Sequence, residues 1–318
     1  MSISDSAIHA LAGAAGGCVS MALTYPLVNL STRAAVSSKK EDLSLHQAIV
    51  KTVKDQGIGG LYSGLGSSLF GITMSNGVYY AAYEETRAWL IKRRKGPAAN
   101  SALTTGEGIV AGLIAGSICT IVTNPIWVVQ AYQSTRAVAS ADGEKKVGPS
   151  ALESFKSIVK QDGIKGLWRG IGPALILVIN PVIQYTTFER MVSALLTWRA
   201  DHAPAGAKAG PTGRSALTDR DLFLLGALSK LIATGSSYPI LVVKSRLQAA
   251  THKYSSSLKA IIQILKTEGI SGLYSGLGPK LLQSALTAAF LFVAQRRIYE
   301  AVKGLVTAAA SKRAAVRA

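Results

Sequence analysis

The chain has 318 residues, with 35 lysines and arginines against 17 aspartates and glutamates, a formal net charge of +18, and 48% hydrophobic but only 16% charged residues. Soluble domains carry about 25% charged residues, so this composition disfavours a soluble domain, and the uncharged stretches along the chain indicate membrane spans. The basic residues fall between long apolar segments, which favours anionic lipid or an anionic solute as a partner and excludes nucleic acid.

Six stretches are candidate transmembrane helices. Four contain no charged residue or histidine: 10–32, 63–83, 108–135 and 170–188. The other two are 222–243, which Lys230 interrupts, and 281–295, which runs on into Arg296 and Arg297. A helix needs ~20 residues to cross a bilayer, and these stretches lack the alternation of barrel strands, so they predict helices. An even number of spans places both termini on one side.

A glycine block recurs three times at a spacing of 106 residues, starting at Gly57, Gly163 and Gly269. Each block ends in a similar string: Leu-Tyr-Ser-Gly at 61–64, Leu-Trp-Arg-Gly at 167–170 and Leu-Tyr-Ser-Gly at 273–276. Repeats at a fixed period indicate an architecture built from like units. Each unit is predicted to hold a span, a short amphipathic loop helix, a glycine-rich turn and a second span.

The first span of each unit carries an internal proline, at Pro26, Pro125 and Pro239. A proline removes a hydrogen bond and kinks its helix, so three such helices around an axis would close one end of the molecule. Gly112 and Gly116 on the third span form a small-xxx-small face that allows close helix packing.

The predicted fold is an all-α membrane protein with six transmembrane helices in three pseudo-symmetric repeats around a central cavity, with short amphipathic loop helices. The predicted segments are repeat 1 at 1–97, repeat 2 at 98–200, a linker at 201–216, repeat 3 at 217–306 and a tail at 307–318.

Three such repeats, each with a kinking proline and a glycine–aromatic–glycine block, resemble the mitochondrial carrier family. The resemblance implies a monomeric transporter that alternates between two gated states around a central solute site. An enzyme is not expected, because the four histidines are dispersed and no metal spacing, nucleophile–base pair or phosphate loop is present. No cofactor, metal or disulfide scaffold is expected either.

The resemblance also implies a gate at the proline end, where the family has Pro-x-acid-x-x-base strings that form a ring of salt bridges. Here the acid slots hold Val28, Trp127 and Leu241, and the base slots hold Ser31, Gln130 and Lys244. A full salt-bridge ring cannot form. We expect this gate to close by apolar packing with polar help, as dry constrictions can.

The family's opposite gate, an aromatic-acid-x-x-base string on the even-numbered spans, is kept in part as Glu84, Arg87 and Glu189. The alternative interpretation is that these are helix-end residues solvated at the membrane surface. The repeated placement favours the gate.

The strings Asn124-Pro125-Ile126-Trp127 and Asn180-Pro181 resemble carriers of nucleotides and nucleotide-containing cofactors. Among these, the strings at 24–33 and 226–230 look most like the fungal peroxisomal membrane carriers. This implies exchange of ATP, ADP, AMP or coenzyme A across the peroxisomal membrane. Two alternatives stay open. One is a mitochondrial inner-membrane carrier of NAD, FAD or pyrimidine nucleotides, and the other is a membrane interaction protein that kept the fold and lost transport.

A nucleotide needs fixed cations and hydrogen-bond donors at membrane depth. Lys230 and Lys244 are the candidates, with a snorkelling or structural lysine as the alternative for Lys230. The family's contact positions correspond to Gly71, Ile72, Leu177, Val178, Gln283 and Ser284, and close to them lie Ser75, Asn76, Tyr79, Asn180, Gln184 and Thr287. Leu177 and Val178 would hold a base ring while Asn180 and Gln184 bond its edge. Ordinary interhelical contacts are the alternative for each polar residue.

Overall fold

The computed structural model describes residues 5–37, 44–93, 103–136, 149–202, 217–249, 254 and 256–287. In chain order the α-helices are α1 (Asp5–Val36), α2 (Leu45–Gln56), α3 (Leu65–Lys92), α4 (Thr105–Arg136), α5 (Ala151–Asp162), α6 (Ile171–Ile176), α7 (Asn180–Asp201), α8 (Asp219–Gln248) and α9 (Ser257–Gly272), followed by a helix over 277–287. Short 3-10 helices are η1 (Ile58–Tyr62), η3 (Ile164–Trp168) and η4 (Leu177–Ile179). These described residues contain no strand, which confirms the all-α prediction.

Within the described part of the chain, three helices are long and apolar enough to cross a membrane, over Thr105–Thr135, Ile164–Asp201 and Arg220–Gln248. They correspond to the predicted third, fourth and fifth spans. The first two predicted spans lie in α1 and α3, which have 32 and 28 residues. The helix over 277–287 covers the start of the predicted sixth span, and the rest of that span lies outside the described residues.

The short helices after α1 and α4 lie where the repeat predicts amphipathic loop helices, and the structure shows that both are capped. Ser44 and Ser150 cap α2 and α5 through reciprocal bonds with Gln47 and Glu153. Such capping boxes satisfy backbone N–H groups at a helix start. The prolines at 26, 125 and 239 lie inside α1, α4 and α8, as predicted.

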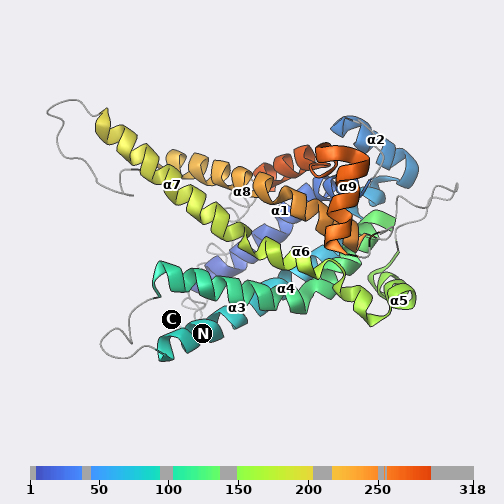
Figure 1. The fold of residues 1–318 in the computed structure, drawn as a ribbon, viewed down its shortest axis with the longest axis horizontal. Helices are drawn as coiled ribbons and strands as arrows, with labels where there is room; N and C mark the ends of the chain where they lie inside the picture. The colour runs from blue at the N-terminus through green and yellow to red at the C-terminus, as the bar shows by residue number, and fades with distance from the viewer. Residues whose placement is uncertain are drawn as a thin grey trace, which may run out of the picture.

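The long helices converge at the end of the molecule where α2, α5 and α9 lie and diverge toward the opposite end (Figure 1). Helix α3 packs on α4, α7 packs on α8, and α1 contacts both α4 and α8. The hydroxyls of Thr24 on α1 and Thr287 on the helix over 277–287 lie 3.0 Å apart. The first and third repeats therefore meet.

The fourth span was predicted as one continuous helix, and the structure shows that it is broken. It is divided into α6, the 3-10 turn η4 and α7. Pro181 is the second residue of α7 and lacks the N–H that would bond to the carbonyl of residue 177 in a continuous helix. The predicted linker beyond residue 202 and the predicted tail at 307–318 lie outside the described residues.

Candidate solute cavity and gates

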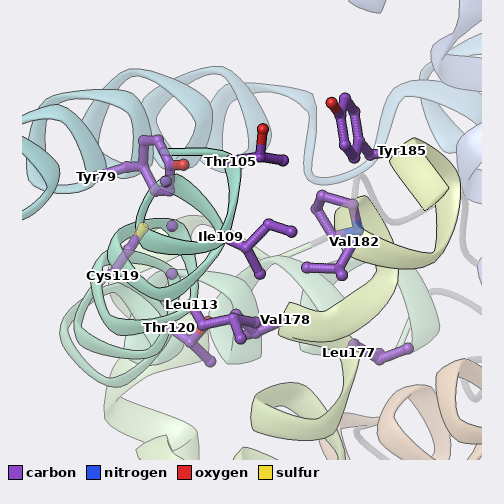
Figure 2. Close-up of a pocket in the computed structure, with 14 residues that line it drawn as sticks. Tyr79, Thr105, Ile109, Leu113, Cys119, Thr120, Leu177, Val178, Val182 and Tyr185 are labelled. Atoms are coloured by element: carbon purple, nitrogen blue, oxygen red, sulfur yellow. The ribbon is translucent and has the colours of Figure 1, made fainter. Parts of the chain in front are cut away.

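A cavity of about 520 Å³ lies between α4 and the segment from η4 into α7, with Tyr79 of α3 beside it. Of the predicted solute contacts, Tyr79, Leu177 and Val178 line it. Figure 2 shows Ile109 and Leu113 of α4 facing this segment, with Val178 and Val182 on the other side. The walls are largely aliphatic, which suits a planar ring better than a charged group.

The glycine face of α4 gives this cavity its shape. A Cβ atom on Gly116 would lie 2.6 Å from Cγ1 of Val178, and one on Gly112 would lie 3.5 Å from the hydroxyl of Tyr79. Both glycines line the cavity. The small-xxx-small pattern therefore provides room for two predicted contact residues.

A second cavity of about 180 Å³ adjoins the first, and Cys119 and Thr120 line both. Its other lining residues are Ser75, Thr123, Asn124, Trp127, Ala174 and Lys244. The indole Nε1 of Trp127 donates to Ser75 Oγ at 3.3 Å, and Ser75 Oγ lies 3.3 Å from Thr123 Oγ1. The structure thus brings a predicted contact, Ser75, together with the predicted gate residues Trp127 and Lys244.

Several other predicted contacts face neighbouring helices. Asn180 Nδ2 donates to the carbonyl of Ala233 at 3.0 Å and to Ser237 Oγ at 2.5 Å, both on α8. Gly71 is buried against Trp127, whose Cζ2 would lie 3.4 Å from an added Cβ. These geometries match the interhelical alternative for Asn180 and a packing role for Gly71.

The predicted contacts on the helix over 277–287 also meet another helix. Gln283 Nε2 donates to Thr287 Oγ1 at 2.8 Å, and the Thr287 carbonyl accepts a bond from Ser20 of α1 at 2.8 Å. Gln283 is buried, whereas Ile72, Gln184 and Ser284 are half-buried and Asn76 is exposed.

The proline end is closed chiefly by hydrogen bonds. Ser31 Oγ donates to the carbonyl of Gly276 at 3.0 Å, and Gln130 Nε2 donates to the hydroxyls of Tyr25 and Ser134 at 3.2 and 3.0 Å. Ser31 and Gln130 are buried. Val28, Trp127 and Leu241 are each half-buried, and no buried cluster in the described residues joins the three.

One equivalent hydrogen bond occurs in each of the three repeats and was not predicted from the sequence. It holds the glycine-rich turn to the first helix of the same repeat. The residue before each proline donates to the carbonyl that precedes the last glycine of its block: Tyr25 to Ser63 at 3.1 Å, Asn124 to Arg169 at 3.3 Å and Tyr238 to Ser275 at 3.0 Å. The signal in the sequence was a polar side chain before every one of the three prolines.

At the opposite end, Arg87 Nη1 lies 3.1 Å from Glu84 Oε2, and the two side chains are 46% and 63% exposed. Both residues belong to α3, so this ion pair joins no two helices. Glu189 is half-buried on α7. In this structure the predicted second gate is not assembled from Glu84 and Arg87.

Lys280 is a candidate cation that the sequence did not predict. It lies on the helix over 277–287 and is half-buried. Its place just before the uncharged run starting at 281 excluded it from the candidate intramembrane residues.

The chain matches the family described as mitochondrial carrier protein over residues 4–94, 101–197 and 218–309. It is 33% identical to the peroxisomal nicotinamide adenine dinucleotide carrier of Arabidopsis thaliana, over 97% of this chain and 100% of that protein. It is also 33% identical to peroxisomal membrane protein PMP47B of Candida boidinii, over 91% of this chain and 84% of that protein. Identity to peroxisomal membrane protein PMP34 of Mus musculus is 30%, over 92% of each chain.

Proposed function

Since the chain belongs to the mitochondrial carrier family and is an integral membrane protein of three repeats, we propose that it exchanges adenine nucleotides or nucleotide-containing cofactors across the peroxisomal membrane. The proposed solutes are ATP, ADP, AMP and coenzyme A. Relatives named as peroxisomal membrane proteins and as a peroxisomal carrier of an adenine dinucleotide support both the compartment and the solute class.

The two-part cavity is the observation that carries the proposal. Its larger part has aliphatic walls, and its smaller part contains Lys244, Ser75 and Thr123. A nucleotide has the same division into a planar ring and a polyanionic part. Burial of the ring and charge-assisted bonds to the phosphates would therefore both be satisfied in one orientation.

Exchange follows from the way the proline end is closed. Its cross-repeat bonds include the neutral bond from Ser31 to Gly276 and charged bonds from Arg33 to Ser134 and from Arg246 to Ala35. A neutral bond contributes about 1 kcal/mol and a charged one about 1.5–3 kcal/mol. A bound solute must offset the loss of these bonds when the end opens, so the loaded carrier crosses between states more readily than the empty one. Transport is then coupled to exchange of one solute for another.

A second candidate solute is NAD. The 33% identity to the Arabidopsis NAD carrier extends over nearly all of this chain and the whole of that relative. NAD also places a diphosphate between two ring systems, which would use the same apolar and cationic regions.

The test is exchange by the purified full chain in liposomes. We expect saturable uptake of labelled ATP that requires internal AMP, ADP or coenzyme A, with vesicles lacking internal solute as the control. Uptake of NAD, FAD or pyrimidine nucleotides in preference to ATP would favour those carriers. Uptake of none would contradict transport and favour an interaction protein. Tagged protein imaged against peroxisomal and mitochondrial markers tests the compartment.

A further inference from the structure

The break in the fourth span lies beside the larger cavity, which Leu177 and Val178 of η4 line. Before the break, α6 packs on both α4 and α8. Pro181 has no N–H to donate back across the turn, so the regular ladder of helix hydrogen bonds does not run through it. A 3-10 stretch inside a helix often marks a hinge. The position of α6 can therefore stay fixed while α7 moves.

Helix α7 is tied to α8 near both of its ends. At its start, Asn180 Nδ2 donates to the carbonyl of Ala233 at 3.0 Å, and near its other end Arg199 Nη2 lies 2.8 Å from Asp221 Oδ1. The two tethers are ~28 Å apart along the helix. Between them α7 runs beside α8 and diverges from α4 (Figure 1). A movement of α7 therefore carries the adjoining part of α8 with it.

Both helices of this pair are interrupted at the same depth. Asn180 also donates to Ser237 Oγ at 2.5 Å, and Pro239 lies two residues further along α8. A proline removes one hydrogen bond from its helix and allows a kink. The turn η4 in one helix and Pro239 in the other therefore lie at one level, about which α7 and residues 219–238 of α8 can swing together.

The gap between α7 and α4 widens away from η4. An added Cβ would lie 2.6 Å from Val178 at Gly116 and 3.5 Å from the hydroxyl of Tyr79 at Gly112, whereas nothing lies within 4 Å of one at Gly108. These glycines follow one another at ~6 Å along α4, toward the end where the helices diverge. The glycine face is thus filled beside η4 and empty beyond it, which leaves room for α7.

We propose that α7 and residues 219–238 of α8 form one arm, which swings about η4 and Pro239 and closes on the glycine face of α4. Val182 and Tyr185 of α7 line the larger cavity, so closure of the arm brings them toward that face and shuts the cavity. The movement rests on the geometry of the helices alone. That it encloses a transported solute rests on the proposed function.

The first test traps the closed arm by disulfide formation in the purified full chain, in a background that carries Cys18→Ser and Cys119→Ser. Nothing lies within 4 Å of a Cβ at position 108, and a disulfide needs Cβ atoms about 3.8 Å apart. The pair Gly108→Cys and Tyr185→Cys should therefore link only when the gap closes. We expect copper phenanthroline to link this pair slowly, and several times more slowly after Pro181→Ala, which restores an N–H across the turn.

The matched control is Val110→Cys with Tyr185→Cys. Val110 is exposed and lies about 200° around α4 from Gly108, so this pair should not link. No link between positions 108 and 185, a link in the control pair at the same rate, or a rate that Pro181→Ala leaves unchanged would overturn the hinge.

The second test measures nucleotide exchange in liposomes. The disulfide between positions 108 and 185 should abolish exchange, and a reductant should restore the variant's own starting rate. Arg199→Cys with Asp221→Cys, joined by a short bifunctional methanethiosulfonate, should keep most of its unlinked rate, because both positions belong to the arm. Loss of exchange in this linked pair would show that α7 and α8 slide past each other, which contradicts a single arm. If the wild type takes up no nucleotide, the proposed function fails, while the disulfide rates still decide for or against the hinge.

Discussion

Gly64, Gly170 and Gly276 lie in the left-handed region, with φ of 87°, 69° and 81°. Each of them faces the first helix of the next repeat. A Cβ atom would lie 3.2 Å from the carbonyl of Gln130 at Gly64, 3.3 Å from that of Lys244 at Gly170, and 2.6 Å from that of Ser31 at Gly276. These three carbonyls belong to the base slots of the first gate. Glycine is needed there both for its backbone conformation and for the close approach.

Replacement of the tightest of these glycines should be costly. Gly276→Ala is expected to lower the free energy of unfolding by at least about 1–2 kcal/mol, the cost of a left-handed conformation with a Cβ, and the contact with Ser31 adds to it. Thermal or denaturant unfolding in detergent measures the effect. Gly278→Ala is the control, because nothing lies within 4 Å of its added Cβ and alanine favours a helix. Equal stability of the two variants would contradict this role.

The sequence predicted part of the candidate cavity. Ser75, Tyr79, Leu177, Val178 and Lys244 line the two cavities, and their helices and approximate depths followed from the repeat. The prediction could not tell a pathway-facing polar group from one bonded to the next helix, as in Asn180, because that depends on which helix packs opposite.

At the level of elements, the prolines and glycine blocks predicted the helices and turns well, because backbone constraints are local. The break of the fourth span at η4 was not predicted, since hydropathy is continuous across it. The bonds from the residues before the prolines were also missed, because they join segments 37 to 45 residues apart.

The repeats also differ in how each short helix is held. Arg246 Nη1 lies 2.5 Å from Glu268 Oε1, and these side chains are only 1% and 10% exposed. Arg246 Nε also donates to the carbonyl of Ala35 on α1 at 2.9 Å. In repeat 2, Arg169 instead pairs with Asp162 at 2.8 Å. The buried pair of repeat 3 thus joins α9, α8 and α1.

Loss of this carboxylate should destabilise the whole protein. Glu268→Ala is expected to cost about 3–5 kcal/mol of unfolding free energy, because it leaves a buried guanidinium without its counter-ion. Glu84→Ala removes one partner of an exposed pair on α3 and should cost under about 1 kcal/mol. Denaturant unfolding of the two variants gives the comparison. A small effect of Glu268→Ala would show that the pair does not hold α9 to its neighbours.

Across the whole molecule, the turn of each repeat contacts the first helix of the next, which closes a ring. Repeat 1 bonds to α4 through Ser63, whose Oγ donates to the carbonyl of Gln133 at 3.0 Å, and repeat 3 bonds to α1 through Ser275, whose Oγ donates to Ala34 at 2.6 Å. One end is therefore closed, while the long helices diverge at the other (Figure 1). The solute pathway in this state should be open to water from the diverging end.

Cys119 tests this asymmetry, because it is a half-buried free cysteine that lines both cavities. A small water-soluble methanethiosulfonate reagent should modify it and reduce uptake by more than half, since the added group would occupy the solute pathway. Excess nucleotide should protect against the modification.

Two variants, Cys119→Ser and Cys18→Ser, show which cysteine is responsible for the loss of uptake. Each variant is compared with its own untreated uptake rate. Cys119→Ser should lose sensitivity to the reagent, while Cys18→Ser, which removes the exposed thiol of α1, should keep it. Mass spectrometry of the treated protein reports which thiol reacted. If Cys119→Ser remains as sensitive as the wild type, or if Cys119 does not react, water does not reach the cavities from the open end in this state.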